Sequence, residues 1–171
     1  GMALSPDGTL VAVAARESMS HAYEGETVSI IDVARAAAGR ADAEVARVPV
    51  GGSDDSQHSR PFGVGFSEDG SFLVASCFRS NAISILDVQA ALVGQPSERH
   101  RLYPEAPVGD PSRPRGIAVC GRYACVIGGA KGGPGSSLVW LIDIEAGTVA
   151  GTVCGVGNES YFLAAVRPAA N

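Results

Sequence analysis

Arg60 and Arg113 stand at matching places in two copies of one short sequence, and Arg115 lies in the second copy. The chemistry of these three arginines is that of anion binding. Arg60 lies in residues 59–63 (SRPFG), and Arg113 and Arg115 lie in residues 112–116 (SRPRG). A guanidinium group binds a carboxylate or a phosphate through two parallel hydrogen bonds. The repetition predicts an anion-binding site, with the alternative that Arg60 and Arg113 bond loop carbonyls just before the prolines.

Two further residues join the arginines as candidates for ligand binding. His58 ends a polar loop and Glu159 lies near the C-terminus, and both fall in segments that connect the apolar runs. A solvated histidine is the alternative for His58, as it is for His21 and His100. No metal site is predicted, because the three histidines are scattered and no Cys or His stands at zinc spacing.

The four cysteines, Cys77, Cys120, Cys125 and Cys154, form no C-x-x-C pair. Cys120 and Cys125 flank a short turn, so a disulfide across that hairpin is one possibility and free thiols in a β core are the other. The glycine-rich segment 128–133 lacks the order of residues of a phosphate-binding P-loop. We therefore expect a loop there and no nucleotide site.

Composition limits both the fold and the partners. The chain has 171 residues, 46% hydrophobic and 18% charged, with 22 glycines and a net charge of −5. Few charges and many glycines suit short buried strands joined by tight turns. No cluster of Lys and Arg predicts nucleic-acid binding, and no apolar stretch is long enough to span a membrane. No signal peptide is recognised, and the compartment stays open.

The elements that position these residues repeat along the chain. Residues 59–88 contain an apolar run, a Ser-Glu-Asp-Gly turn, a run from Phe72 to Cys77, and a third run that ends at Asp87. A similar turn recurs elsewhere in the chain, and similar closing aspartates recur at Asp32 and Asp143, each about 55 residues from Asp87. Each unit predicts an antiparallel meander of strands. Such repeated carboxylates predict N-caps and turn acceptors rather than catalysts, and Asp7 and Asp69 fit the same role.

Four-stranded units with this period are typical of β-propeller blades, which stack face to face and bury both sides. We predict an all-β fold with about three blades and one extra strand. The expected bounds are about 3–50, 59–104, 112–154 and 161–166. An immunoglobulin-like sandwich is the alternative, but a sandwich would not restate one turn and one closing motif at a fixed interval.

The repeated motifs resemble a known family. The turn Ser-Pro-Asp-Gly, the Arg-Pro-x-Gly-Val approach and the closing sequence Val-Ser-Ile-Ile-Asp-Val are similar to the YVTN-type β-propeller repeat of surface-layer-like, lactonase-like and quinoprotein amine dehydrogenase-like propellers. The YVTN tetrapeptide itself is replaced by residues 11–14 (VAVA) and 74–77 (VASC). The resemblance implies the fold and does not name an activity.

Three functional classes stay open on the sequence. The first is a non-catalytic scaffold that binds a ligand or protein through its loop face and central channel. A lactonase-like hydrolase and a quinoprotein-like oxidoreductase are the alternatives, and no cofactor is assigned. Because propellers contain four to eight blades, three blades predict either a homodimer that closes the ring or a part of a longer propeller.

Overall fold

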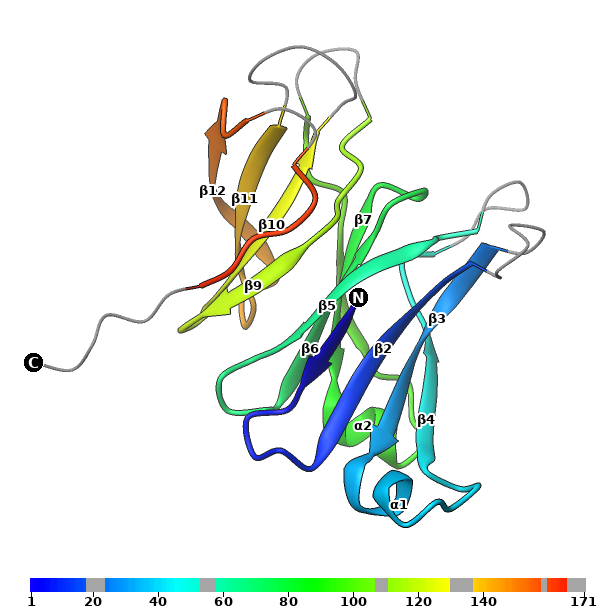
Figure 1. The fold of residues 1–171 in the computed structure, drawn as a ribbon. Coiled ribbons are helices and arrows are strands. Elements are labelled where there is room, and N and C mark those ends of the chain that lie inside the picture. The colour runs from blue at the N-terminus through cyan, green and yellow to red at the C-terminus, as the bar shows by residue number, and fades with distance from the viewer. Residues whose placement is uncertain (18–23, 53–57, 107–110, 130–136, 158–159, 166–171) are drawn as a thin grey trace, which may run out of the picture.

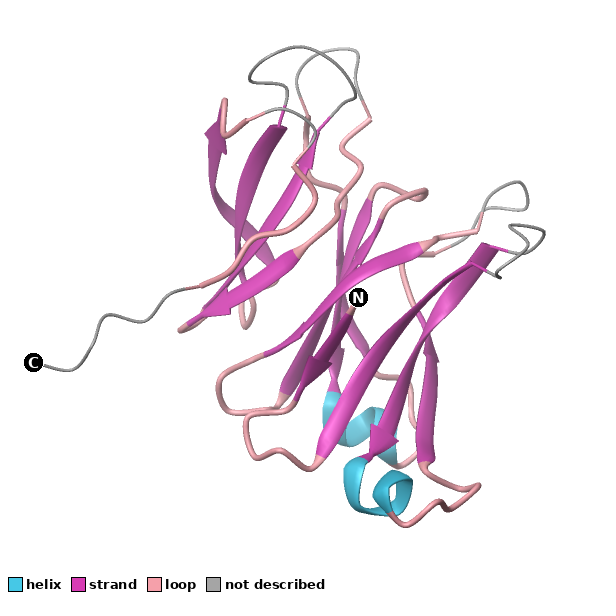
Figure 2. Ribbon diagram, in the orientation of Figure 1, coloured by secondary structure: helices cyan, strands magenta, loops and turns pink. Residues whose placement is uncertain are grey.

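The computed structural model describes residues 1–17, 24–52, 58–106, 111–129, 137–157 and 160–165, and it is an all-β structure with two short helices (Figures 1 and 2). Three antiparallel sheets of four strands follow one another along the chain. Each sheet has its strands in sequence order, so each is a meander, as predicted. Among the described residues no helix is long and apolar enough to cross a membrane.

The bounds of the elements are as follows. Sheet 1 contains β1 (Met2–Leu4), β2 (Leu10–Glu17), β3 (Glu24–Asp32) and β4 (Glu44–Pro49), with α1 (Val33–Ala37) between β3 and β4. Sheet 2 contains β5 (Pro61–Phe66), β6 (Phe72–Cys77), β7 (Ala82–Asp87) and β8 (Glu98–Leu102), with α2 (Val88–Leu92) between β7 and β8. Sheet 3 contains β9 (Ile117–Cys120), β10 (Tyr123–Gly129), β11 (Ser137–Asp143) and β12 (Thr148–Cys154).

Local side-chain bonds explain why the turns and helices stand where they do. Asp32 and Asp87 accept the backbone N–H of the third helical residue, so both are the N-caps that the sequence predicted. In sheet 3 the same position, Asp143, accepts from Ala146 N and closes a tight turn in place of a helix. In the turns before β2 and β6, the Gly8 N–H donates to the Ser5 carbonyl and the Gly70 N–H donates to the Ser67 carbonyl. Both glycines have a positive φ, which this kind of turn favours.

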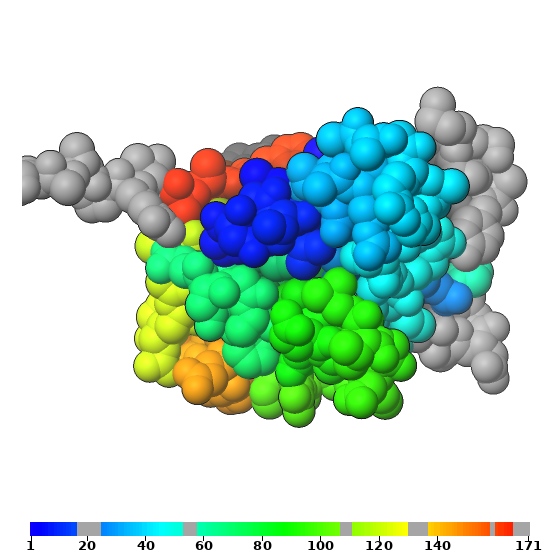
Figure 3. All heavy atoms as spheres, turned by 90° about the horizontal axis from the view of Figure 1, so that it is seen from below, coloured from blue at the N-terminus to red at the C-terminus, as the bar shows by residue number. Residues whose placement is uncertain are grey.

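The three sheets pack face to face, and Figure 3 shows them in sequence order around the molecule. The first core contains Ala12, Val28 and Ile30 of sheet 1 with residues of sheet 2, and the second contains residues of sheets 2 and 3. Strand β6 illustrates how the middle sheet serves both. Leu73 and Ala75 belong to the first core and Val74 to the second, so alternate residues face opposite neighbours.

Two expectations about the strands need correction. The polar sequence of residues 16–26 predicts a loop between two strands. The loop is shorter than that, because β2 continues to Glu17 and β3 starts at Glu24. The extra strand expected at 161–166 is not a strand over the described residues 160–165. The Tyr161 carbonyl of this segment accepts a backbone hydrogen bond from Gly116 N.

Candidate functional site

The three predicted arginines meet around one aromatic ring. The guanidinium carbons of Arg60, Arg113 and Arg115 lie 5.8, 5.7 and 5.6 Å from the centre of the Phe78 ring. At such distances a guanidinium group is attracted by the electron-rich face of an aromatic ring. Phe78 follows β6 directly, whereas the arginines precede β5 and β9, so the site joins segments of sheets 2 and 3.

Further aromatic residues extend this group. The Phe62 ring lies 6.4 Å from that of Phe78 and 6.1 Å from that of Tyr161, and the Arg16 guanidinium lies 5.4 Å above it. Phe162 is 5.9 Å from Phe62 and is 74% exposed. We call the set Arg16, Arg60, Arg113, Arg115, Phe62, Phe78, Tyr161 and Phe162 the arginine–aromatic cluster.

The backbone holds two arginines of the cluster in an unusual conformation. Arg60 has a φ of 52° and Arg113 a φ of 44°, in the left-handed region that residues with side chains rarely adopt. The Arg60 carbonyl accepts from Phe78 N, and Arg113 N donates to Asn81 Oδ1. The loop after β6 therefore clamps Arg60 and Arg113 at equivalent positions of the repeat. Strain of this kind often marks functional positions.

Arg115 differs from the other two arginines because it is almost fully buried, at 1% exposure. Its guanidinium carbon lies 4.8 Å from the centre of the Tyr161 ring, and its Nη1 donates to the Ser160 carbonyl at 3.2 Å. These contacts tie segment 160–165 to sheet 3. Arg115 is thus placed to position the aromatic rings, while Arg60 and Arg113 are half-buried and reach the surface.

The remaining candidate residues lie apart from the cluster or outside the residues that the structure describes. His58 Nδ1 is 3.2 Å from Glu26 Oε2, and both side chains are partly exposed. His100 lies on outer strand β8, where its ring packs over the Gly147 backbone. Glu159 and His21 fall outside the described residues. Within the described part of the chain, no group of three His, Cys, Asp or Glu residues could hold a metal ion.

All four cysteines are free thiols, so the hairpin disulfide that was one possibility for Cys120 and Cys125 is not formed. In the β9–β10 ladder Cys120 lies opposite Tyr123 and Cys125 opposite Ala118, so the two thiols are not cross-strand partners. Cys77 is fully buried, and burial raises the pKa of its thiol to about 12. That thiol is therefore protonated and unreactive at neutral pH.

Sequence reasoning missed the aromatic half of the cluster. In the sequence, Phe78 directly follows the apolar run from Phe72 to Cys77, and Tyr161 falls in the expected extra strand, so neither residue is marked as part of a site. The sequence did contain a signal for these rings. An Arg-Pro motif with an aromatic residue, Phe62, comes before β6, and a second aromatic residue, Phe78, comes after β6. Only the packing of sheet 3 on sheet 2 brings Arg113 and Arg115 to Phe78, because they lie far from it in sequence.

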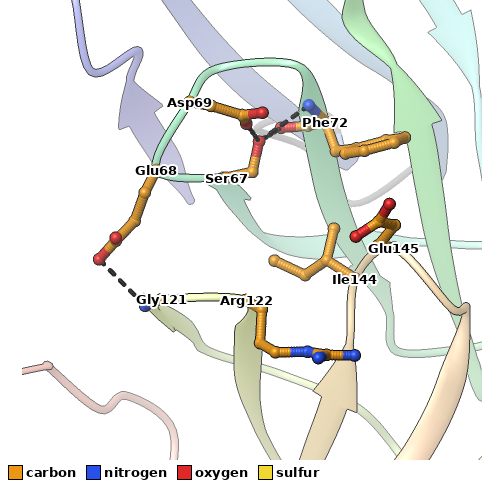
Figure 4. Close-up of a pocket in the computed structure, with 8 residues that line it drawn as sticks. All are labelled: Ser67, Glu68, Asp69, Phe72, Gly121, Arg122, Ile144 and Glu145. Atoms are coloured by element: carbon orange, nitrogen blue, oxygen red, sulfur yellow. Dashed lines mark hydrogen bonds between the residues drawn. The ribbon is translucent and has the colours of Figure 1, made fainter.

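A separate pocket of about 380 Å³ lies between sheets 2 and 3, on the side of the short turns (Figure 4). The Glu68 carboxylate crosses the gap and accepts the Gly121 N–H at 3.0 Å. Arg122 forms an ion pair with Asp143. Because the bond between Glu68 and Gly121 connects sheet 2 to sheet 3, we regard this pocket as part of the contact between the two sheets.

Asp69 lies in the turn between β5 and β6, which lines this pocket. We expect Asp69→Ala to destabilise the protein in a pH-dependent manner. The Ser67 hydroxyl, then the Ser71 hydroxyl and N–H, lower the pKa of Asp69 from 3.8 to about 2. A folded-state pKa below the unfolded value means that the carboxylate stabilises the protein above about pH 4. That contribution is lost as the pH falls toward 2. Chemical denaturation at pH 7 should show a loss of about 1 kcal/mol, small because the group is exposed.

The control for this prediction is Glu145→Ala, which removes an exposed carboxylate of the same pocket. It should change the free energy of unfolding by less than about 0.5 kcal/mol at every pH. The gap between wild type and Asp69→Ala should narrow steadily from pH 5 to pH 2. A gap that is equally large at pH 7 and pH 2.5 would mean that the charge is not responsible.

Comparison with known proteins identifies the fold. No family model matches the chain, and no curated protein matches it. A β-propeller chain in a crystal structure of the mitotic checkpoint complex superposes with a TM-score of 0.59 at 17% identity, over 90% of this chain and 36% of that chain. Hydrazine synthase from Kuenenia stuttgartiensis aligns with a TM-score of 0.47 at 17% identity, over 90% of this chain and 48% of that chain.

The class of protein is therefore a β-propeller, of which this chain contains three four-stranded blades. The three sheets are blades 1, 2 and 3 from here on. The chain spans about a third of the length of the mitotic checkpoint chain that it matches. At this level of identity the likeness establishes the fold, and function has to be argued from the site.

Proposed function

We propose that this chain is a YVTN-type β-propeller that serves as a non-catalytic scaffold, binding an anionic ligand or an acidic protein segment at the arginine–aromatic cluster. The observation that carries the proposal is the convergence of Arg60, Arg113 and Arg115 on the Phe78 ring, within 5.8 Å in each case. Arginine and aromatic side chains are the residues that most often dominate binding energy at protein interfaces.

The cluster divides its work between positioning and contact. The buried Arg115 holds the Tyr161 ring in place, while Phe78 supports the flat faces of Arg60 and Arg113. A guanidinium group that is held against an aromatic ring loses less conformational entropy when it binds a ligand. The half-buried Arg60 and Arg113 are accordingly the residues that would contact a carboxylate or phosphate.

We expect Arg60→Gln and Arg113→Gln each to weaken anion binding. The measurement is calorimetric titration of the intact protein with a hexaglutamate peptide and, separately, with inorganic phosphate. Each substitution removes one charge-assisted, forked contact and should raise Kd about fivefold to tenfold, or about 1 to 1.4 kcal/mol. Phosphate that binds while the peptide does not would narrow the ligand to a small anion.

The matched control is Arg47→Gln, which changes an arginine of outer strand β4 with a 63% exposed side chain that pairs with Glu44. Its Kd should equal that of the wild type. The proposal is wrong if neither probe binds, or if Arg47→Gln weakens binding as much as Arg60→Gln does.

The hydrolase and oxidoreductase alternatives are tested by other measurements. A lactonase-like enzyme needs acid and base groups close to the arginines, and a quinoprotein-like domain needs a bound redox group. A pH–rate profile with a lactone substrate and a metal content scan should both be blank for a binding scaffold.

We also propose that the propeller ring is closed beyond the three blades of this chain, either by a second copy or by further blades of a longer protein. The strand registers place Val139, Leu141 and Val153 on the outward face of blade 3. They place Met2, Leu4 and Val13 on the outward face of blade 1. An exposed apolar sheet face invites association. The solution mass distinguishes a homodimer from a single chain.

A further inference from the structure

Arg113 differs in its charge partners from the exposed arginines at the rim of the blades. Each of those pairs with an Asp or Glu side chain, and they are Arg35, Arg40, Arg47, Arg99, Arg101 and Arg122. Within the described residues no carboxylate pairs with the Arg113 guanidinium group, which lies over the Phe78 ring. Because a half-buried charge is costly unless it is paired, Arg113 favours an anion that comes from outside the chain.

The backbone of Arg113 is held by a side chain, whereas that of Arg60 is held by another backbone group. Arg113 N donates to Asn81 Oδ1 at 3.0 Å, and Arg60 N donates to the Gly25 carbonyl at 3.0 Å. Both bonds hold an arginine in the left-handed region. A substitution at residue 81 can therefore remove the bond to Arg113 while the bond to Arg60 stays in place.

Asn81 is itself fixed in the loop between β6 and β7. Its φ is 56°, in the left-handed region that Asn adopts more readily than most residues. Its carbonyl accepts from Ser112 Oγ at 3.2 Å, directly before Arg113 in the chain. Its Nδ2 donates to the Arg79 carbonyl at 3.5 Å. These bonds direct Oδ1 toward the Arg113 N–H.

The loop that begins at Phe78 and ends at Asn81 thus contacts Arg113 at two points. Asn81 holds the backbone at a φ of 44°, and Phe78 supports the guanidinium group, whose carbon lies 5.7 Å from the ring centre. A left-handed φ is strained for arginine and persists only where its surroundings enforce it. Without the bond to Asn81 the backbone of Arg113 can relax, and the guanidinium group then loses its fixed place over the ring.

We propose that Asn81 is a positioning residue for anion binding and that it acts through Arg113. Asn81 fixes the backbone from which the Arg113 side chain reaches a carboxylate or phosphate. The inference rests on the proposed binding function. It adds that the geometry of Arg113, unlike that of Arg60, depends on one side chain of the β6–β7 loop.

Asn81→Gly tests this role, because glycine keeps the left-handed φ without strain and removes the side-chain acceptor. The measurement is calorimetric titration of the intact protein with inorganic phosphate and, separately, with hexaglutamate. We expect Kd to rise about threefold, less than for Arg113→Gln, because the guanidinium group remains but is placed less well.

A double-variant comparison shows through which arginine Asn81 acts. In an Arg60→Gln background, Asn81→Gly should again raise Kd about threefold, because the two positions are independent. In an Arg113→Gln background the same substitution should change Kd by less than about 1.5-fold, because the group that Asn81 positions is gone.

The matched control is Ser112→Ala, which removes the neighbouring bond to the Asn81 carbonyl and keeps the bond from Arg113 N to Asn81 Oδ1. It should destabilise the same loop and leave Kd within about twofold of the wild type. Urea denaturation of Ser112→Ala and Asn81→Gly compares their stabilities. A general weakening of the loop would raise Kd in both variants.

A second measurement needs no ligand. Nuclear magnetic resonance relaxation of the arginine Nε–H groups reports how ordered each guanidinium group is on the fast timescale. The Arg113 signal is assigned by its absence in Arg113→Gln. In Asn81→Gly the order parameter of Arg113 Nε–H should fall, and that of Arg60 should stay at its wild-type value.

Three results would overturn the proposal. The first is an unchanged Kd or an unchanged Arg113 order parameter in Asn81→Gly. The second is an equal effect of Asn81→Gly in the Arg113→Gln background, and the third is an equal rise of Kd in Ser112→Ala. If neither phosphate nor hexaglutamate binds, the proposed binding function is wrong, and the order parameter by itself decides whether Asn81 positions Arg113.

Discussion

Replacing Trp140 by Ala should remove about 3 to 5 kcal/mol from the free energy of unfolding, the largest loss expected for any single substitution considered. Trp140 is 1% exposed and packs in the core between blades 2 and 3 with Val74, Ile83 and Ile85. Its Nε1 donates to the Glu105 carbonyl at 2.9 Å. The substitution leaves a cavity and deprives that carbonyl of its donor.

The measurement is urea denaturation followed by far-ultraviolet circular dichroism, because Trp140 is the single tryptophan of the chain. Trp140→Phe should keep most of the apolar contact and cost less than the alanine variant. Tyr103→Ala, at a side chain 62% exposed, is the control and should lie within about 0.5 kcal/mol of wild type. A loss below about 1 kcal/mol for Trp140→Ala would mean that blades 2 and 3 do not share this core.

Adding one methyl group at Gly63 should destabilise the protein by about 1 to 3 kcal/mol, because nothing nearby can yield. The new Cβ would lie 2.5 Å from the Arg115 carbonyl and 3.2 Å from Ile117 N, both backbone atoms of blade 3. Ser76 Oγ also lies in the way at 3.1 Å, where it accepts the Gly63 N–H and donates to the Arg115 carbonyl. Gly63→Ala therefore forces the two blades apart.

Gly151→Ala is the matched control, since it adds the same methyl group to outer strand β12, where no atom lies within 4 Å. That variant should be neutral or stabilise the fold by up to about 1 kcal/mol, because glycine in a strand costs conformational entropy. Thermal and urea unfolding of both variants give the comparison. If Gly63→Ala and Gly151→Ala had equal free energies of unfolding, the inner strands β5 and β9 would be farther apart than in the structure.

Local features were predictable because the bonds that make them span few residues. Strand β6 has the bounds that its apolar run indicated, and Asp32 and Asp87 are the N-caps that the repeat predicted. The interval between the repeats also indicated units of four strands. Wherever a strand borders a loop without such a local bond, as at residue 16 or 161, the prediction was less accurate.

The candidate site was predictable in part. Matching positions in the repeat pointed to Arg60 and Arg113, and Arg115 lies in the same motif as Arg113. The structure brings all three to one ring. The separation of roles among them was not predictable. Arg115 is buried against Tyr161 because segment 160–165 folds back on blade 3, and no local pattern describes that contact.

By itself the sequence determined the all-β class, the turns and caps, and the repeat of four strands, since each depends on hydrogen bonds and alternation within one short segment. Tertiary structure decided which side of β6 faces which blade and which aromatic rings the arginines meet. It also decided that the Asn81 side chain meets the backbone of Arg113. These features depend on how separate sheets pack, and packing joins residues whose distance along the chain carries no signal of their contact.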